Sequence, residues 1–130
     1  MKQATQPIDV LIVEDDQSLN EAYWRILEAE HYSVERCYNG AEALEKLSKM
    51  QPRIILLDLK MPVMGGIEFL TKFSKLEPKH KPKIIIFSNY SQQAEVQDAF
   101  DLGATKYLLK AWASPKELVK LVQETIQSND

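Results

Sequence analysis

Cysteine is nearly absent from this chain, since Cys37 is the only one among 130 residues and cannot form an internal disulfide. No apolar run approaches the ~20 residues that a helix needs to cross a bilayer, and residues 1–6 lack the apolar stretch of a secretory signal. Positive charge is not in excess either, because the formal net charge is −3. These absences predict a cytoplasmic protein with no membrane segment and no direct electrostatic binding to nucleic acid.

The length and composition are those of one globular domain. Hydrophobic residues make up 45% of the chain and charged residues 27%. A chain of this length buries roughly two-thirds of its unfolded surface without disulfides or structural metal. We therefore expect a single domain over residues 1–130, with an ordered core over about residues 7–127 and no room for a separate catalytic or DNA-binding module.

Short apolar runs recur along the chain and predict buried strands. Three of them are nearly continuous aliphatic stretches that end at polar residues, as strands covered on both faces of a parallel sheet do: Ile8–Val13, Arg53–Leu57 and Lys83–Phe87. Two weaker runs, Ser33–Cys37 and Thr105–Leu109, are also interpreted as strands.

The segments between these runs have the periodicity of amphipathic helices. The apolar residues that share one helical face in the first three segments are Leu19, Tyr23, Ile26 and Leu27; Ala43, Leu44, Leu47 and Met50; and Ile67, Leu70 and Phe73. A fourth helix is expected over Ala94–Leu102, with Gly103 at its C-terminal end. The last helix is marked by a capping hydroxyl, a first-turn proline and a capping-box acid, which are Ser114, Pro115 and Glu117.

This alternation predicts an α/β fold with five β-α units. Helices must cover both faces of one parallel sheet, because the sequence has neither a repeat nor a linker that would divide it. Right-handed crossovers leave few topologies, and a doubly wound five-stranded sheet of order 2-1-3-4-5 is the commonest at this size.

Polar residues that carry chemistry follow the predicted strands at their carboxyl ends: Glu14 and Asp15 after the first, Asp58 after the third, Ser88 at the fourth and Lys110 at the fifth. In this topology the first and third strands are neighbours at the crevice where open α/β sheets bind ligands. Asp15 and Asp58 should therefore converge there. Taken alone, an acidic loop of this kind is more often solvated surface or a helix N-cap.

Crowded carboxylates repel one another unless a cation joins them, and a set of oxygen ligands suits Mg²⁺ better than zinc. A carboxylate beside Mg²⁺ is a competent nucleophile toward phosphorus. Ser88 could then donate a hydrogen bond to a phosphoryl oxygen while Lys110 balances its charge, as phosphoryl transfer requires. The sequence thus predicts a phosphoryl-accepting site at Asp58.

Two segments of the chain resemble a known family, the receiver domains of bacterial two-component response regulators. Ile8–Asp16 is similar to the family's first strand and acidic pair, and Leu57–Glu68 resembles its phosphoacceptor segment almost residue for residue. The resemblance implies that Asp58 accepts the phosphoryl group of a phosphohistidine. It also implies that Glu14, Asp15, Asp58 and the backbone carbonyl of Lys60 hold Mg²⁺.

The remaining signature positions match as well. The resemblance places Ser88 as the switch hydroxyl, Tyr107 as the switch aromatic residue and Lys110 as the invariant lysine. It implies a phosphorylation-switched binding module, apparently stand-alone, that catalyses only its own phosphotransfer and dephosphorylation. The implied partners are a sensor histidine kinase or histidine phosphotransfer protein and a downstream effector protein. Two copies could pair through the face of the helix 94–102, the strand 105–109 and the last helix.

The sequence departs from the family pattern at three positions. Ala111 stands where the family usually has a proline in a cis peptide after the lysine. Asn89 is larger than the residue that usually follows the switch hydroxyl, and its bulk would narrow the entrance to the site. Trp112 replaces a smaller residue, so it either packs on the last helix or adds apolar area to the signalling face.

Two other functions remain open at this stage. One is a phosphohydrolase with an aspartyl-phosphate intermediate, similar to haloacid-dehalogenase-like phosphatases. Such enzymes carry Asp-x-Asp after the first strand, whereas here Lys60 stands two residues after the candidate nucleophile Asp58. The other is a receiver-like scaffold that is never phosphorylated, which the complete set of site residues disfavours.

Overall fold

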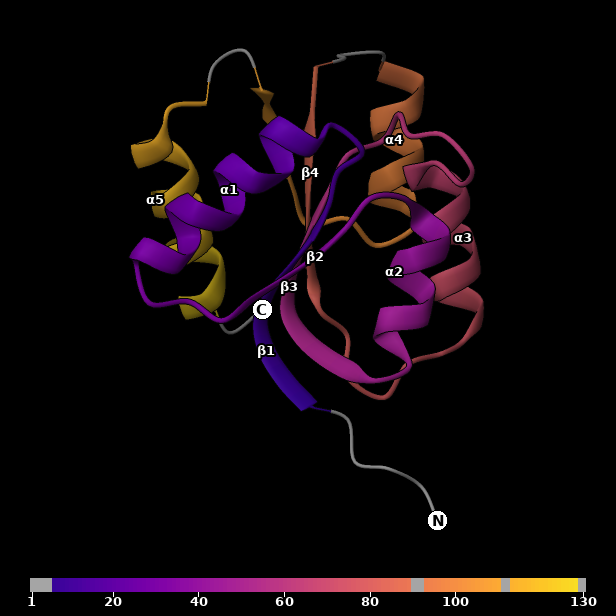
Figure 1. The fold of residues 1–130 in the computed structure, drawn as a ribbon. Coiled ribbons are helices and arrows are strands. Elements are labelled where there is room, and N and C mark those ends of the chain that lie inside the picture. The colour runs from indigo at the N-terminus through magenta and orange to yellow at the C-terminus, as the bar shows by residue number, and fades with distance from the viewer. Residues whose placement is uncertain (1–5, 90–92, 111–112, 129–130) are drawn as a thin grey trace.

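The computed structural model describes residues 6–89, 93–110 and 113–128. In this part of the chain, strands and helices alternate in the order that the sequence predicts (Figure 1). Their bounds are β1 Gln6–Val13, α1 Gln17–Ala29, β2 Val34–Cys37, α2 Gly40–Leu47, β3 Met50–Leu57, α3 Gly66–Lys75, β4 Lys83–Ser88, α4 Gln93–Asp101, β5 Lys106–Leu109 and α5 Pro115–Gln127.

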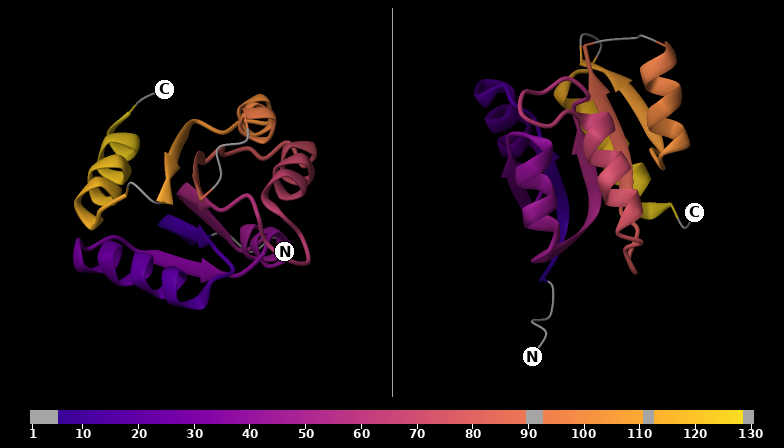
Figure 2. Two further views of the ribbon diagram at one scale, coloured as in Figure 1. Left: turned by 90° about the horizontal axis from the view of Figure 1, so that it is seen from above. Right: turned by 90° about the vertical axis from the view of Figure 1, so that its right-hand side faces the viewer.

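The five strands form one parallel sheet of order β2-β1-β3-β4-β5, which confirms the predicted doubly wound, flavodoxin-like fold. Val13 of β1 pairs with Leu57 of β3, so the chain leaves these two neighbouring strands at the same level of the sheet. Helices α1 and α5 cover one face, and α2, α3 and α4 cover the other (Figures 1 and 2). The polar residues that follow β1 and β3 are thereby placed side by side.

Burial on both faces explains the nearly continuous aliphatic strands. Val10 and Ile12 pack with Tyr23 of α1 and Leu118 of α5, whereas the alternate residues of β1 pack toward the helices of the opposite face. The buried aromatic residues on that opposite face come from α3, where the rings of Phe69 and Phe73 stack with centroids 5.7 Å apart. One core therefore lies on each side of the sheet.

The structure corrects several predicted boundaries. Met50 does not belong to the face of α2, because that helix ends at Leu47 and Met50 opens β3. β3 starts three residues before the predicted Arg53 and includes Pro52, which pairs with Ile8 of β1. β4 first pairs with β3 at Ile54, so Pro52 lies beyond that ladder, where a missing N–H is tolerated.

The remaining boundaries differ by one or two residues at element ends, where hydrogen bonding and patterning are weakest. β1 begins at Gln6, β2 at Val34 and β5 at Lys106. Leu102 lies just beyond α4, and Gly103 follows it with φ +115°, a conformation that suits glycine at a helix C-terminus. The predicted cap of α5 is confirmed on its serine side, since Ser114 Oγ accepts from the backbone N–H of Glu117 at 3.2 Å.

Across residues 6–89, 93–110 and 113–128, no helix combines the length and apolar composition needed to span a bilayer. Cys37 is fully buried on the edge strand β2. His31 and His80 are exposed.

Candidate functional site

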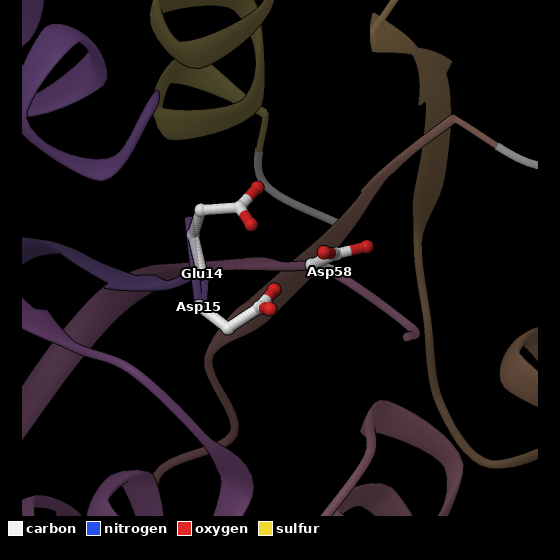
Figure 3. A group of neighbouring side chains, drawn as sticks. All are labelled: Glu14, Asp15 and Asp58. Atoms are coloured by element: carbon white, nitrogen blue, oxygen red, sulfur yellow. The ribbon is translucent and has the colours of Figure 1, made fainter. Parts of the chain in front are cut away.

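Three carboxylates meet at the carboxyl ends of β1 and β3. Glu14 and Asp15 follow β1, Asp58 follows β3, and one carboxylate oxygen from each residue lies within 4.8 Å of the others (Figure 3). The backbone N–H of Asp58 donates to the carbonyl of Val13 at 3.0 Å, which extends the parallel pairing of the two strands to this level. Glu14 and Asp58 are buried, whereas Asp15 is exposed.

Lys110 joins the two buried carboxylates from the end of β5. Its Nζ donates to Asp58 Oδ2 at 3.2 Å and forms an ion pair with Glu14 Oε1. The lysine side chain is only 7% exposed. Residues far apart in the sequence therefore form one buried charge network, in which a single ammonium group faces two carboxylates.

Burial raises the pKa of the Glu14 carboxyl to about 7, because the hydrogen bond with Lys110 only partly offsets the loss of solvent and the negative charge of Asp58 adds to the rise. Burial alone would lower the pKa of Lys110. Its hydrogen bond with Glu14 and the charges of both carboxylates outweigh that effect and leave this pKa raised. The site thus holds one protonated lysine beside two buried carboxyl groups.

A network around Asn20 of α1 fixes the backbone of the acidic loop, and sequence reasoning missed it. The fully buried side-chain amide of Asn20 donates to the carbonyl of Glu14 at 2.8 Å and to that of Cys37 at 2.9 Å, while its oxygen accepts from Arg36 Nε at 2.7 Å. The guanidinium of Arg36 lies over the ring of Trp24, 4.9 Å from its centroid. The sequence signal that could have identified Asn20 is its position, because this polar residue stands at helical spacing from the buried apolar residues of α1.

The first turn of α1 also contributes to the loop. Asp16 is the N-cap of this helix, and its Oδ1 accepts from the backbone N–H of Leu19 at 3.0 Å. The backbone N–H of Asp16 donates in turn to Glu14 Oε2 at 3.2 Å. Asp16 is thus occupied by helix capping.

The loop after β3 is closely packed around two glycines. A Cβ on Gly66 would lie 2.8 Å from the carbonyl oxygen of Asp58, and one on Gly40 would lie 2.9 Å from side-chain atoms of Met64. The carbonyl of Met64 also accepts from the N–H of Gly40 at 2.9 Å, which ties the loop to α2. A side chain at Gly66 would displace the backbone at Asp58, and one at Gly40 would displace Met64 in the same loop.

Val63 occupies a strained position in the same loop. Its φ is +69°, in the left-handed region that β-branched residues rarely adopt, and it is 82% exposed. The N–H of Met64 donates to the carbonyl of Pro62 at 2.7 Å, so the chain turns tightly around Val63.

The predicted site residues are placed as follows. A cavity of about 250 Å³ is lined by Glu14, Asp15, Asp16, Leu19, Asp58, Lys60, Ser88, Asn89 and Lys110. Ser88 is buried at the end of β4, and Asn89 is among the lining residues. Tyr107 is half-buried on β5 and is not among the lining residues that the structure describes. The peptide between Lys110 and Ala111, and Trp112, lie outside the described residues.

The three clustered side chains are carboxylates, whose oxygen atoms are the ligands that Mg²⁺ prefers. The three carboxylates therefore fit a hard divalent cation. The ammonium group of Lys110, 3.2 Å from Asp58 Oδ2, can also stabilise an anion bound in this cavity.

Comparison with known proteins agrees with this geometry. The family model described as the response regulator receiver domain matches residues 10–123. The chemotaxis protein CheY of Thermotoga maritima is 33% identical over 116 residues, which cover 88% of this chain and 94% of that protein. A solved receiver domain protein, CheY-like, from Methanospirillum hungatei superposes with a TM-score of 0.82 at 30% identity, covering 95% of this chain and 94% of that one.

A longer relative contains a similar segment. The protein-glutamate methylesterase/protein-glutamine glutaminase of Treponema denticola is 35% identical over 124 residues, which are 93% of this chain but 33% of that protein. This chain thus spans about a third of the length of that relative. With the family model covering most of the sequence, the chain belongs to the response regulator receiver domain family.

Proposed function

We propose that this chain is a phosphorylation-switched signalling module whose phosphoacceptor is Asp58. The observation that carries the proposal is the meeting of three carboxylate oxygens within 4.8 Å, with Lys110 held against the two buried acids. A buried carboxylate beside a fixed ammonium group has both the nucleophile and the charge partner that phosphoryl transfer needs. The proposed donor is the phosphohistidine of a sensor kinase or phosphotransfer protein in the cytoplasm.

In the proposed step a carboxylate oxygen of Asp58 attacks the phosphorus of the donor. The new P–O bond forms as the P–N bond breaks, and the electron pair of that bond leaves with the imidazole, which takes up a proton. Lys110 neutralises the phosphoryl oxygens, and the Ser88 hydroxyl at the end of β4 donates a hydrogen bond to one of them. The acyl phosphate is later lost to water, so the chain catalyses only its own modification.

Glu14, Asp15 and Asp58 would hold Mg²⁺, together with the backbone carbonyl of Lys60. Bound there, the ion supplies charge neutralisation between the nucleophile and the incoming phosphoryl group. Glu14 and Asp58 already share one cation in Lys110, so the residues are disposed to bind charge of this sign. Asp15 is exposed and makes no ion pair with the described residues, which leaves its carboxylate available as a ligand.

The output of the module is a change of surface. We propose that Ser88 moves toward the phosphoryl group, that Tyr107 of β5 follows it, and that the face of α4, β5 and α5 changes shape for an effector protein or a second copy. Ser88 and Tyr107 lie on adjacent strands, where Ser88 pairs with Leu109, so a shift at one strand end reaches the other strand directly.

The test is phosphorylation by acetyl phosphate, which needs no partner protein. Wild-type protein with Mg²⁺ should gain one phosphoryl adduct by mass spectrometry. Hydroxylamine should remove the adduct, and EDTA added before acetyl phosphate should prevent its formation. Asp58→Asn should gain none, whereas Asp101→Asn, at an exposed acid of α4, should behave like wild type. An adduct that persists in Asp58→Asn would refute the assignment.

A further inference from the structure

Positive charge is concentrated at the end of the sheet farthest from Asp58. Residues 72–83, which run from the last turns of α3 into β4, contain five lysines and a single acid, Glu77, in a chain of net charge −3. These lysines are Lys72, Lys75, Lys79, Lys81 and Lys83. The segment lies where the strands begin, at the lower end of the sheet in Figure 1.

Most of these lysines have no acidic partner among the residues that the structure describes. Lys72 pairs with Glu68 at 3.2 Å within α3. Lys75, Lys79, Lys81 and Lys83 form no ion pair with any acid in the described part of the chain, and the first three are exposed. The positive potential of this surface is therefore not cancelled locally.

Two adjoining cavities lie beneath the lysines. One of about 450 Å³ is lined by Phe73, Ser74, Glu77, Pro78, Lys81, Pro82, Ile84, Leu102 and Gly103. The second, of about 250 Å³, is lined by Leu47, Met50, Gln51, Pro52, Phe73, Pro78, Lys79, His80 and Pro82. The two share three walls, Phe73, Pro78 and Pro82, and we call the combined feature the lysine groove.

The lysine groove is preformed and apolar at its base. Phe73 and Ile84 belong to the buried core, so the floor is fixed by packing of α3 and β4. Pro78 and Pro82 restrict the backbone of the connecting segment on either side of the lysines, which lowers the cost of ordering it around a ligand. An apolar base with a cationic rim favours a ligand that has an apolar anchor and negative charge around it.

We propose that the lysine groove is a docking site for an acidic peptide segment of a partner protein, with an apolar side chain of that segment in the larger cavity. Charge complementarity supports this occupant. Lys81 lines the larger cavity and Lys79 the smaller one, and the other lysines lie outside both, so the positive charge is spread over a length that suits an extended acidic chain. Two adjoining cavities along one segment suit a peptide better than a single small molecule. Nucleic acid is disfavoured because the acidic side chain of Glu77 lines the larger cavity and would repel phosphates.

Docking there is independent of the proposed phosphorylation. Ile84 lines the larger cavity and Ser88 lines the cavity at Asp58, and the two lie four residues apart on β4, a separation of ~13 Å along the strand. A ligand in the lysine groove therefore leaves the phosphoacceptor accessible. This inference stands whether or not Asp58 accepts a phosphoryl group.

The experiment uses a fluorescent synthetic peptide in which one phenylalanine is flanked by aspartates and glutamates. Its anisotropy is titrated with wild type, with Lys79→Glu/Lys81→Glu, and with Ser74→Trp, which fills the larger cavity from an exposed position on α3. The charge-matched control is Lys116→Glu/Lys120→Glu, at two exposed lysines of α5. We expect at least about tenfold weaker binding in the first two variants, wild-type binding in the control, and no effect of beryllofluoride with Mg²⁺.

Several outcomes would overturn the proposal. Absence of saturable binding to wild type would do so, as would equal losses in both lysine pairs, which would mean non-specific attraction. Equal binding of a peptide with serine in place of phenylalanine would show that no apolar side chain anchors the peptide in the larger cavity. Tighter binding of a DNA oligonucleotide of the same charge would assign the groove to nucleic acid. Acetyl phosphate labelling of Lys79→Glu/Lys81→Glu keeps these outcomes separate from a failure at Asp58.

Discussion

Asn20 donates a hydrogen bond from its buried side-chain amide to the backbone carbonyl of Glu14 at 2.8 Å. The same amide group reaches the carbonyl of Cys37 at 2.9 Å, so one helix residue joins the ends of β1 and β2. The backbone N–H of Glu14 also donates to Cys37 at 3.1 Å. The backbone that carries the Glu14 carboxylate is therefore held by α1 and β2.

Asn20→Ala should destabilise the fold by about 2–4 kcal/mol, because the carbonyls of Glu14 and Cys37 and the Nε of Arg36 each lose a hydrogen bond. It should also reduce the thermal shift that Mg²⁺ produces, since the Glu14 backbone is released. Urea unfolding measures the first effect and a Mg²⁺ titration of the melting temperature the second. Asn39→Ala is the control, because Asn39 caps α2 by accepting from the N–H of Glu42 and should cost about 1 kcal/mol with an unchanged Mg²⁺ response.

Mg²⁺ should raise the melting temperature of the wild type, because a ligand that binds only the folded state stabilises it by mass action. Asp15→Ala should show a much smaller rise at the same millimolar concentration, since it removes one of the three clustered carboxylates. Asp15 is exposed, so the variant should melt near the wild-type temperature without metal. Equal shifts in the two proteins would show that Asp15 is not a ligand.

Lys110→Met should lower stability by about 3–5 kcal/mol, because it leaves Glu14 and Asp58 buried without their cation. Mg²⁺ should then stabilise the variant more than the wild type, since the ion replaces the lost positive charge. Differential scanning calorimetry with and without Mg²⁺ gives both quantities. Lys72→Met removes an exposed pair with Glu68 and should change stability by less than about 1 kcal/mol; a loss as large as that of Lys110→Met would contradict the argument.

Val63→Asn should stabilise the fold by about 1 kcal/mol, because asparagine tolerates the left-handed backbone that valine adopts there at a cost. The side chain is 82% exposed, so little apolar burial is lost. Chemical unfolding provides the measurement. Leu76→Asn changes another exposed apolar residue, at an ordinary φ of −75°, and should not stabilise the fold. A destabilised Val63→Asn would mean that the valine makes a contact worth more than the strain.

Cys37 should resist iodoacetamide in the folded protein, because burial raises the pKa of its thiol to about 12 and leaves no thiolate near pH 8. The same group links stability to pH. Its folded-state pKa lies above the unfolded value of ~8.5, so the stability it contributes is complete below that pH and declines as pH rises toward 12. Mass spectrometry in buffer and in urea measures the modification, with Cys37→Ala as the blank. Rapid labelling without urea would contradict the buried thiol.

The fold was largely predictable because its strands are buried on both faces. The runs ending at Val13 and Leu57 are aliphatic throughout, since neither side of β1 or β3 meets water. Chemistry-bearing residues then fall at strand ends, so the convergence of Asp15 and Asp58 follows from strand order. The start of β3 was not predictable in the same way, because Met50 lies three residues after Leu47 and fits the helical pattern equally well.

The contacts that support the site could not be predicted from the hydrophobic periodicity of the sequence. Asn20 accepts from Arg36, sixteen residues away, and such a pairing leaves no local pattern in the sequence. The strained turn at Val63 was equally hidden, because valine is a residue that local preference would place elsewhere. Sequence patterns thus indicated which residues reach the site, whereas only the structure identifies those that hold them in place.

β4 carries Ile84 at one end and Ser88 at the other, in two cavities that open at opposite ends of the sheet. A partner whose acidic segment rests against Ile84 would stay tethered while its other parts search the neighbourhood of Asp58. Tethering converts each later encounter into an intramolecular one, at an effective concentration of the order of millimolar for a short flexible linker. Weak contacts at Asp58 would then suffice for selective phosphoryl exchange. Contacts in the lysine groove, at the other end of β4, would select the partner.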